Sequence, residues 1–236
     1  MKKIAFVLLT LMMISCKSSS TSGSSFSVPA MYVALSFDDG PNNTTTPQML
    51  DVLEAFDAPA SFFVIGQYIN DSTAGQMKRA VSMGCEIQNH SYTHSFMSEL
   101  TPEEVKSEIE RTDALIEKYV GVRPWLFRPP YINHNQSMHE VIGHTFICGL
   151  GCEDWVPERT ALMRYDDIMA NVKNGDVILL HDFDGNDNTV ETLRKLIPAL
   201  REKGFTLVTV TQLFEKMGVK PEAHNGIIYT NAMQTK

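Results

Sequence analysis

Ser36-Phe37-Asp38-Asp39-Gly40-Pro41 closes the first apolar run of the chain, which covers residues 31–37. Further apolar runs follow, and segments with helical periodicity separate them. These further apolar runs cover about residues 60–65, 85–89, 125–128, 145–150, 176–181 and 205–210. Short apolar strands that alternate with helices are typical of parallel α/β proteins. The sequence therefore predicts a parallel sheet of about seven strands with helices packed against it.

The chemically reactive side chains follow the ends of these runs. Asp38 and Asp39 follow the first run, His90 the third, Arg128 the fourth, Asp154 and Trp155 the fifth, and His181 the sixth. In a parallel barrel the carboxyl ends of the strands converge on one face, where active sites are built. An open doubly wound sheet also places ligands at strand ends, but it gathers fewer strands around one point. The pattern therefore favours a (β/α) barrel.

His90-Ser91-Tyr92-Thr93-His94 supplies two histidines four residues apart, and Asp39 supplies a carboxylate. Two imidazoles and a carboxylate are three protein ligands, as in catalytic zinc sites that keep the fourth position for water. The neighbouring Asp38 is then free to act as a general base. Alone, the Asp-Asp-Gly-Pro stretch could be an ordinary turn. Together with the histidines it predicts a metal centre with a base beside it.

The first residues predict export. Lys2 and Lys3 precede an apolar stretch of about ten residues, which is too short to span a bilayer. Residues 1–15 resemble a bacterial lipoprotein signal, whose cleavage leaves Cys16 as a lipidated N-terminus, and residues 16–28 then form a flexible tether. An ordinary secretory peptide is the alternative. With lipid on Cys16, we expect the protein to be anchored to a membrane of the bacterial cell envelope, facing the periplasm or the surface.

Composition limits the partners and the number of domains. The formal net charge is -8, and it becomes -10 without Lys2 and Lys3, so we expect no binding to nucleic acid. No low-complexity linker follows residue 26, which suits a single catalytic domain over residues 29–218. Residues 219–236 have weak periodicity and are expected to form a C-terminal surface tail. Nothing in the pattern calls for a second subunit, so we expect a monomer.

Five segments, taken in order, resemble the motifs of the NodB-type polysaccharide deacetylases, which are carbohydrate esterase family 4. The segments are Phe37-Asp38-Asp39-Gly40-Pro41, His90-Ser91-Tyr92-Thr93-His94, Arg128-Pro129-Pro130-Tyr131, Asp154-Trp155 and Leu179-Leu180-His181-Asp182. The resemblance covers about residues 30–215. It implies a distorted (β/α) barrel that removes acetyl groups from N-acetylated or O-acetylated glycans. It also implies a divalent metal, usually Zn²⁺, with Co²⁺, Ni²⁺ or Mn²⁺ as other possibilities.

The same resemblance implies a role for each residue. Asp39, His90 and His94 hold the metal, Asp38 is the general base, His181 is the general acid, Arg128 pairs with Asp38 and Asp154 tunes His181. The backbone N–H of Tyr131 faces the oxyanion, while Trp155 and Leu179 form the wall of the acetyl pocket. Ile132 and Gly151 stand where the family often has Gly and Asp, and both positions bear on the shape of the groove.

The chemistry of amide hydrolysis requires the same set of groups. The reaction needs an activated water, a stabilised oxyanion and a proton for the leaving nitrogen. A bound metal lowers the pKa of its water from about 15.7 toward about 7, and Asp38 can take the proton as that water attacks. His181 belongs to a different strand end and can protonate the nitrogen from the other side.

Four functions fit the sequence, and we place a deacetylase of N-acetylated glycans first. Its substrates would be polysaccharides that contain N-acetylglucosamine, peptidoglycan or chitooligosaccharides. An O-acetyl esterase on xylan-like polymers would use the same groups. A glycan-binding lipoprotein without activity would normally lack one of the reactive residues, and none is missing here. A non-heme iron oxygenase also uses two histidines and a carboxylate, but usually on a β-sandwich, which the alternating pattern opposes.

Overall fold

A computed structural model describes residues 30–234 of the chain. Within this range the chain alternates between strands and helices, as the apolar runs predict. The strands are β1 (Met31–Asp38), β2 (Ser61–Val64), β3 (Glu86–Asn89), β4 (Leu126–Phe127), β5 (Thr145–Ile147), β6 (Val177–His181), β7 (Phe205–Val208) and β8 (Ile228–Tyr229). The predicted signal peptide, Cys16 and the tether lie outside the described residues.

Helices follow most of the strands. They are α1 (Thr45–Ala55), α2 (Ala74–Ser82), α3 (Pro102–Val120), α4 (Gln136–Val141), α5 (Ala161–Asn171), α6 (Asp187–Glu202) and α7 (Val210–Met217), with short 3₁₀ turns at Gly66–Tyr68, Met97–Glu99 and Pro130–Ile132. Thr101 begins α3 with a capping box. Its hydroxyl accepts a hydrogen bond from the backbone N–H of Glu104, and the Glu104 carboxylate accepts one from the backbone N–H of Thr101. None of the helices within residues 30–234 is both long and apolar enough to cross a membrane.

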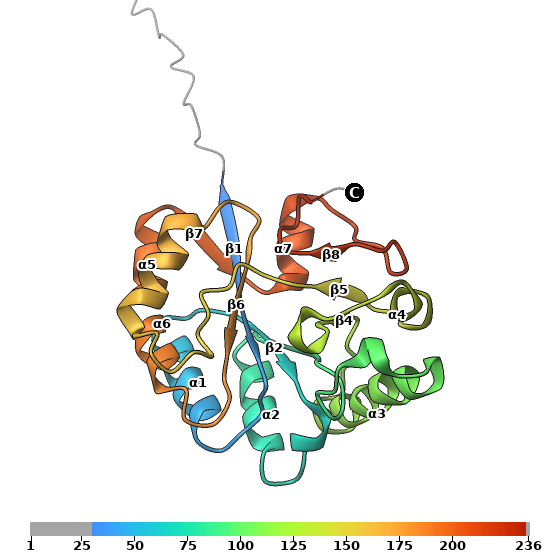
Figure 1. Ribbon diagram of the computed structural model, residues 1–236. Coiled ribbons are helices and arrows are strands. Elements are labelled where there is room, and N and C mark those ends of the chain that lie inside the picture. Colours follow the sequence, from blue (N-terminus) through green and yellow to red (C-terminus); the bar gives the residue numbers. More distant parts are fainter. Residues whose placement is uncertain (1–29, 235–236) are drawn as a thin grey trace, which may run out of the picture.

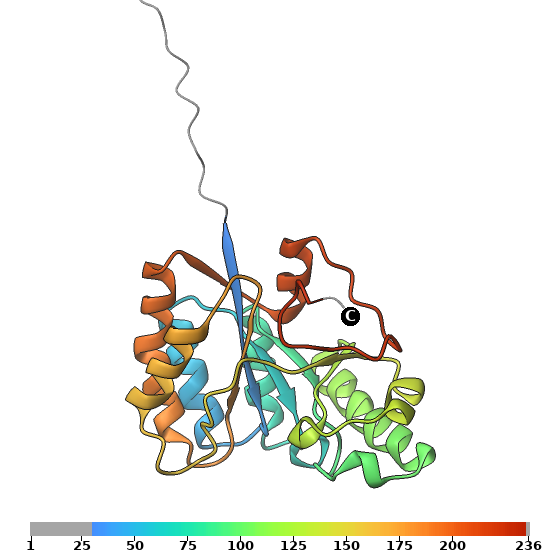
Figure 2. The ribbon, with the colours of Figure 1, turned by 45° about the horizontal axis from the view of Figure 1, so that its top comes forward.

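The strands pair in parallel in the order β6-β1-β2-β3-β4-β5-β8, and β7 pairs with the first half of β1. After β5 the chain returns to β6, because Leu150 forms a parallel bridge with Ile178. The sheet is therefore curved into the distorted (β/α) barrel that the sequence predicts. Figure 1 and Figure 2 show α1, α5 and α6 side by side on one flank of β1 and β6, while α2 and α3 cover β2 and β3.

Alternation along β1 divides the buried side chains between two environments. Val33, Leu35 and Phe37 pack with the inner faces of the helices in the largest apolar cluster. Successive residues of a strand point to opposite faces of the sheet. Ser36 and Asp38 therefore point into the barrel, where polar atoms must find hydrogen-bond partners. The first strand thus supplies both the apolar core and the beginning of the polar site.

Residues 219–234 differ from the surface tail that the weak periodicity predicted. Their strand β8 pairs with β5, and Tyr229 is 5 % exposed. The N–H of Cys148 donates to the carbonyl of Tyr229 at 2.8 Å, and the N–H of Val177 donates to that of Thr230 at 3.0 Å. This segment therefore lies beside β5 (Figure 1) and reaches β6 through the bond of Thr230. A two-residue strand leaves too short an apolar pattern to be recognised in the sequence.

Candidate active site

The three predicted metal ligands lie together at the carboxyl end of the barrel. One possible ligand atom from each of Asp39, His90 and His94 lies within 4.8 Å of the other two. Oδ1 of Asp39 is 3.4 Å from Nε2 of His90 and 3.3 Å from Nε2 of His94. These separations suit three ligands that share one metal ion, because two ligands at about 2.1 Å in a tetrahedral arrangement lie roughly 3.4 Å apart.

The protonation of these residues also suits a metal. Nδ1 of His90 lies 2.6 Å from the carbonyl oxygen of Arg128, so Nδ1 carries the proton and Nε2 keeps a free lone pair. Burial alone would raise the pKa of Asp39, but the neighbouring histidines, His90 foremost with His181 and His94, lower it to about 2. Burial lowers the pKa of His94.

An unpartnered atom marks the centre of this group. Oδ1 of Asp39 is buried and has no hydrogen-bond partner among the described residues. A buried carboxylate oxygen without a partner is costly, unless an ion or ligand binds it. The donor set, its protonation and this orphaned oxygen together fit a divalent metal.

Asp38 faces the same centre but is held by an arginine. Nη1 of Arg128 lies 2.5 Å from Oδ1 of Asp38, and both side chains are almost completely buried. Arg128 also donates to the hydroxyl of Ser36 at 2.9 Å and to the carbonyl of Cys148 at 2.6 Å, and it lies over the ring of Phe63. Oδ2 of Asp38 remains directed toward Nε2 of His90, 3.7 Å away.

His181 lies on the neighbouring strand, level with Asp38. The register of β1 and β6 pairs the two residues directly. Nδ1 of His181 is 2.7 Å from Oδ1 of Asp154, and its backbone N–H donates to Oδ2 of Asp154 at 2.8 Å. Burial would lower the pKa of His181, but the hydrogen bond and charge of Asp154, with the charges of Asp38 and Asp39, raise it to about 9. His181 is thus equipped to carry a proton at neutral pH.

Asp154 is held in place by residues that the sequence reading did not identify. Its Oδ2 accepts from the hydroxyl of Thr189 at 2.8 Å and from the side-chain amide of Asn186 at 3.2 Å. Both residues belong to the start of α6, and Asp154 itself is completely buried. Ordinary helix-start residues gave no sequence signal for this role.

Asp182 explains the glycine of the first motif. The carboxylate of Asp182 is completely buried and accepts from the hydroxyl of Thr46 at 2.6 Å. A Cβ atom on Gly40 would lie only 2.5 Å from Oδ2 of Asp182, so no larger residue fits there. Burial, together with the charges of Asp39 and Asp38, raises the pKa of Asp182 to about 7. The turn that carries Asp39 therefore packs directly against Asp182, the residue that follows His181.

A cavity of about 570 Å³ opens beside the metal ligands. Its lining includes Asp38, Tyr131, Trp155, Leu179 and His181, so every residue predicted to contact the acetyl group reaches it. Trp155 is half exposed and lies edge-on to the ring of His181, with ring centroids 5.3 Å apart. Leu179 is 5 % exposed and contributes an apolar surface deeper in the wall.

The turn that carries Tyr131 is conformationally strained. Tyr131 and Ile132 both have left-handed backbones, with φ of 57° and 53°. This region is unfavourable for any residue with a Cβ and most of all for a β-branched one. The glycine that the family often has after the tyrosine would avoid the strain. The ring of Tyr131 instead packs on Phe96, with centroids 4.1 Å apart, and edge-on against His94 at 4.6 Å.

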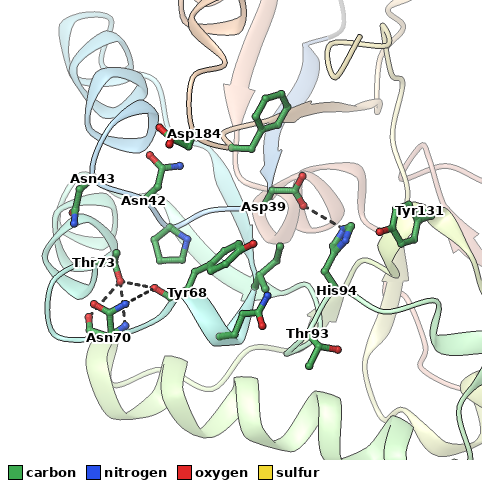
Figure 3. Close-up of a pocket in the computed structure, with 14 residues that line it drawn as sticks. Asp39, Asn42, Asn43, Tyr68, Asn70, Thr73, Thr93, His94, Tyr131 and Asp184 are labelled. Carbon is green, nitrogen blue, oxygen red and sulfur yellow. Dashed lines mark hydrogen bonds and ion pairs between the residues drawn. The ribbon is translucent and has the colours of Figure 1, made fainter. Parts of the chain in front are cut away.

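A second cavity of about 760 Å³ continues from the metal ligands in the other direction. It shares Asp39, His94 and Tyr131 with the first cavity. Figure 3 shows Tyr68, Asn70 and Thr73 on its far side. The two cavities therefore form one groove that passes over the metal ligands.

Comparison with known proteins identifies the family. The family model of the polysaccharide deacetylases matches residues 27–145. The chain is also 36 % identical over 190 residues to a peptidoglycan-N-acetylglucosamine deacetylase of Bacillus cereus, covering 77 % of this chain and 87 % of that protein. The chain belongs to the polysaccharide deacetylase family, as its five motifs predicted.

Two further relatives are named for xylan. A bifunctional xylanase/deacetylase of Pseudobutyrivibrio xylanivorans is 44 % identical over 189 residues, which is 80 % of this chain but only 31 % of that protein. A family 4 acetyl xylan esterase from Clostridium thermocellum, solved with a cobalt ion, has a TM-score of 0.84 and 38 % identity. That match covers 86 % of this chain and 100 % of the other, and it confirms the fold class.

Proposed function

We propose that this protein is a metal-dependent hydrolase that removes acetyl groups from a glycan. The observation that carries the proposal is the arrangement of three groups around one cavity. Asp39, His90 and His94 supply metal ligands, Arg128 holds Asp38 beside them, and Asp154 holds His181 on the neighbouring strand. The relatives named above as deacetylases and as an esterase support the same reaction class.

Each residue would have one task. A divalent metal bound by the three ligands would lower the pKa of a water molecule and polarise the acetyl carbonyl. Asp38 takes the proton of the attacking water at Oδ2, because Arg128 occupies Oδ1. His181 gives a proton from Nε2 to the leaving atom, since Nδ1 is bound to Asp154. Trp155 and Leu179 enclose the methyl group, and the backbone N–H of Tyr131 faces the oxygen that gains charge.

The metal in this proposal is Zn²⁺. Two histidine nitrogens and one carboxylate oxygen are ligands that catalytic zinc commonly uses. Related sites also accept Co²⁺, as the cobalt-bound esterase illustrates, and Ni²⁺ or Mn²⁺ are alternatives. Metal analysis of protein purified without added metal, with one zinc per chain as the expected result, tests this choice.

The first candidate substrate is an N-acetylated glycan. An amine is a poor leaving group that must be protonated, and the raised pKa of His181 keeps that proton available at neutral pH. The second candidate is an O-acetylated xylan, and the identities favour it. Over the matched regions, the bifunctional xylanase/deacetylase and the acetyl xylan esterase are 44 % and 38 % identical to this chain, against 36 % for the peptidoglycan deacetylase.

Acetate release separates the two candidates. The panel would contain chitooligosaccharides, peptidoglycan fragments and acetylated xylo-oligosaccharides of matched length. The N-acetyl assignment requires the higher kcat/KM on the first two, and faster release from the xylo-oligosaccharides would assign the protein to O-acetyl esters. Release from none of them, by metal-loaded protein, would contradict the proposed function itself.

We also propose that the protein is exported and held at a membrane by lipid on Cys16. The support is the sequence of residues 1–28 alone, with its basic start, short apolar stretch and serine-rich tether. Cys16→Ala should release the protein from the membrane fraction into the soluble fraction, because the lipid would be the only anchor. A Cys16→Ala protein that still sediments with membranes would require another attachment.

A further inference from the structure

The loop that carries the ligand His94 adopts an unfavourable backbone. It follows β3 and covers residues 91–94. Ser91 has a φ of 66° and His94 a φ of 61°, so two of its four residues are left-handed without being glycine. Such conformations persist only where the surrounding structure fixes them. Some other part of the chain must therefore hold this loop in shape.

Each of the four backbone N–H groups of this loop donates a hydrogen bond to a side-chain oxygen atom. The bonds are Ser91 N–H to Oδ1 of Asn89 at 2.8 Å, Tyr92 N–H and Thr93 N–H to Oε2 of Glu108 at 2.9 and 2.7 Å, and His94 N–H to the hydroxyl of Ser91 at 3.0 Å. Of the acceptor residues, Ser91 lies within the loop and Asn89 ends β3 just before it. Glu108 reaches the loop from α3, and its Oε2 accepts two of the four bonds. The backbone N–H groups of Gly66 and Gln67 also bind the loop, because they donate to the carbonyls of Ser91 and Tyr92 at 2.9 and 3.0 Å.

Interactions outside the loop do not account for the buried position of Glu108. It lies on the inner face of α3 and is 7 % exposed. Within residues 30–234 no lysine, arginine or histidine forms an ion pair with it. A buried carboxylate without a cation needs strong hydrogen bonds to offset the loss of water. The loop amides provide them, so the charge and the loop stabilise each other.

We propose that Glu108 is a positioning residue for the metal centre. By fixing the amides of Tyr92 and Thr93, it sets the left-handed turn at His94 and thereby the direction of the His94 imidazole toward Asp39. Glu108 lines neither of the two cavities over the metal ligands. The proposal rests on the metal site of the proposed function, and it predicts that Glu108 governs metal affinity.

The test measures metal affinity in the absence of substrate. Metal-free protein would be titrated with Zn²⁺ against a chelating indicator, and thermal unfolding of the metal-free form would report the fold. Removal of groups that orient metal ligands typically weakens metal binding about 10- to 100-fold. Glu108→Ala should show a loss of this size, with activity restored at high metal concentration. Glu110→Ala, on the exposed face of the same helix, should bind metal as the wild type does.

Two conservative variants separate position from charge. Glu108→Gln keeps an acceptor oxygen in the same place and should recover most of the metal affinity. Glu108→Asp keeps the charge but withdraws the oxygen, and it should bind metal more weakly than Glu108→Gln. The comparison of Glu108→Gln with Glu108→Asp tests the positioning role even if Glu108→Ala does not fold.

The opposite order, with Glu108→Asp tight and Glu108→Gln weak, would overturn the proposal. Wild-type affinity in folded Glu108→Ala would also overturn it, because the loop would then hold its shape unaided. Both results leave the proposed function intact, provided that the wild type binds metal and releases acetate. A wild-type protein that binds no metal at these ligands would instead refute the metal site first.

Discussion

Arg128 and Asp38 form a buried ion pair, in which Nη1 of Arg128 lies 2.5 Å from Oδ1 of Asp38 inside the barrel. The pair occupies one carboxylate oxygen and leaves the other, Oδ2, facing His90. Two adjacent aspartates are thereby given different surroundings. Asp38 is bound to the guanidinium of Arg128, while Oδ1 of Asp39 lies buried between two histidines and has no hydrogen-bond partner within residues 30–234.

Asp38→Asn should keep the metal and lose most of the activity. Asparagine retains the size of aspartate and an acceptor for Arg128, but it cannot take a proton from water. Loss of a general base typically lowers the rate about 10²- to 10⁴-fold. Metal content and acetate release, measured on the same preparation, check this, with Asp39→Ala as the companion variant that should lose metal first. Metal lost from Asp38→Asn and kept by Asp39→Ala would reverse the two roles.

Asp154→Asn should move the alkaline limb of the pH profile to lower pH. The limb reports deprotonation of the acid, and Asp154 helps to raise the pKa of His181 from 6.5 to about 9. Without that charge the limb should shift toward neutral pH in a profile of kcat/KM. An unshifted limb in Asp154→Asn would assign it to another group.

The same pair should make stability depend on pH. The pKa of His181 is higher in the folded protein than its ordinary value. Its contribution is therefore complete below about pH 6.5 and is lost as pH rises through about 9. In metal-free protein, the difference in unfolding free energy between the wild type and Asp154→Asn should shrink over that interval, as denaturant titrations would show.

His181→Ala should spare the metal and distinguish between leaving groups. An amide needs a proton on nitrogen before the bond breaks, whereas a phenolate leaves without one. We therefore expect a large loss of kcat on N-acetylated oligosaccharides and a much smaller loss on an activated aryl acetate. Equal losses on both would deny His181 the part of the acid that protonates the leaving group.

Ile132→Gly should cost little stability, although a half-buried side chain is removed. A left-handed backbone disfavours residues with a Cβ by roughly 1–2 kcal/mol, and its relief offsets the entropy that glycine loses on folding, about 1 kcal/mol. Ile227→Gly is the control, because Ile227 is also half-buried and its backbone is not left-handed. Urea unfolding should show the control to be clearly less stable, and equal losses in the two variants would argue against strain at Ile132.

The fold could be predicted because its signal is local and repeated. Each of the seven apolar runs became a strand, since these patterns depend on near neighbours in the chain. Strand β8 could not be predicted in this way. Its two residues pair with β5, and the next residue, Thr230, accepts a hydrogen bond from Val177 of β6; both strands lie far away in the sequence.

The residues placed at strand ends could be predicted for a similar reason. Parallel strands bring their carboxyl ends to one edge, so Asp38, His90 and His181 were expected to meet, and the structure places them together. The residues that support them gave no such signal. Glu108 and Thr189 look like ordinary helix residues until the tertiary structure brings them to the loop of His94 and to Asp154.

Metal dependence of acetate release is the most direct test of the account. Wild-type protein stripped with a chelator should remain folded, release no acetate, and regain full activity when one equivalent of metal per chain is returned. His94→Ala should neither bind that equivalent tightly nor regain the activity, because only two ligands remain. Undiminished acetate release from metal-free wild type, or full recovery by His94→Ala at one equivalent, would contradict the central claim that Asp39, His90 and His94 form the catalytic metal site.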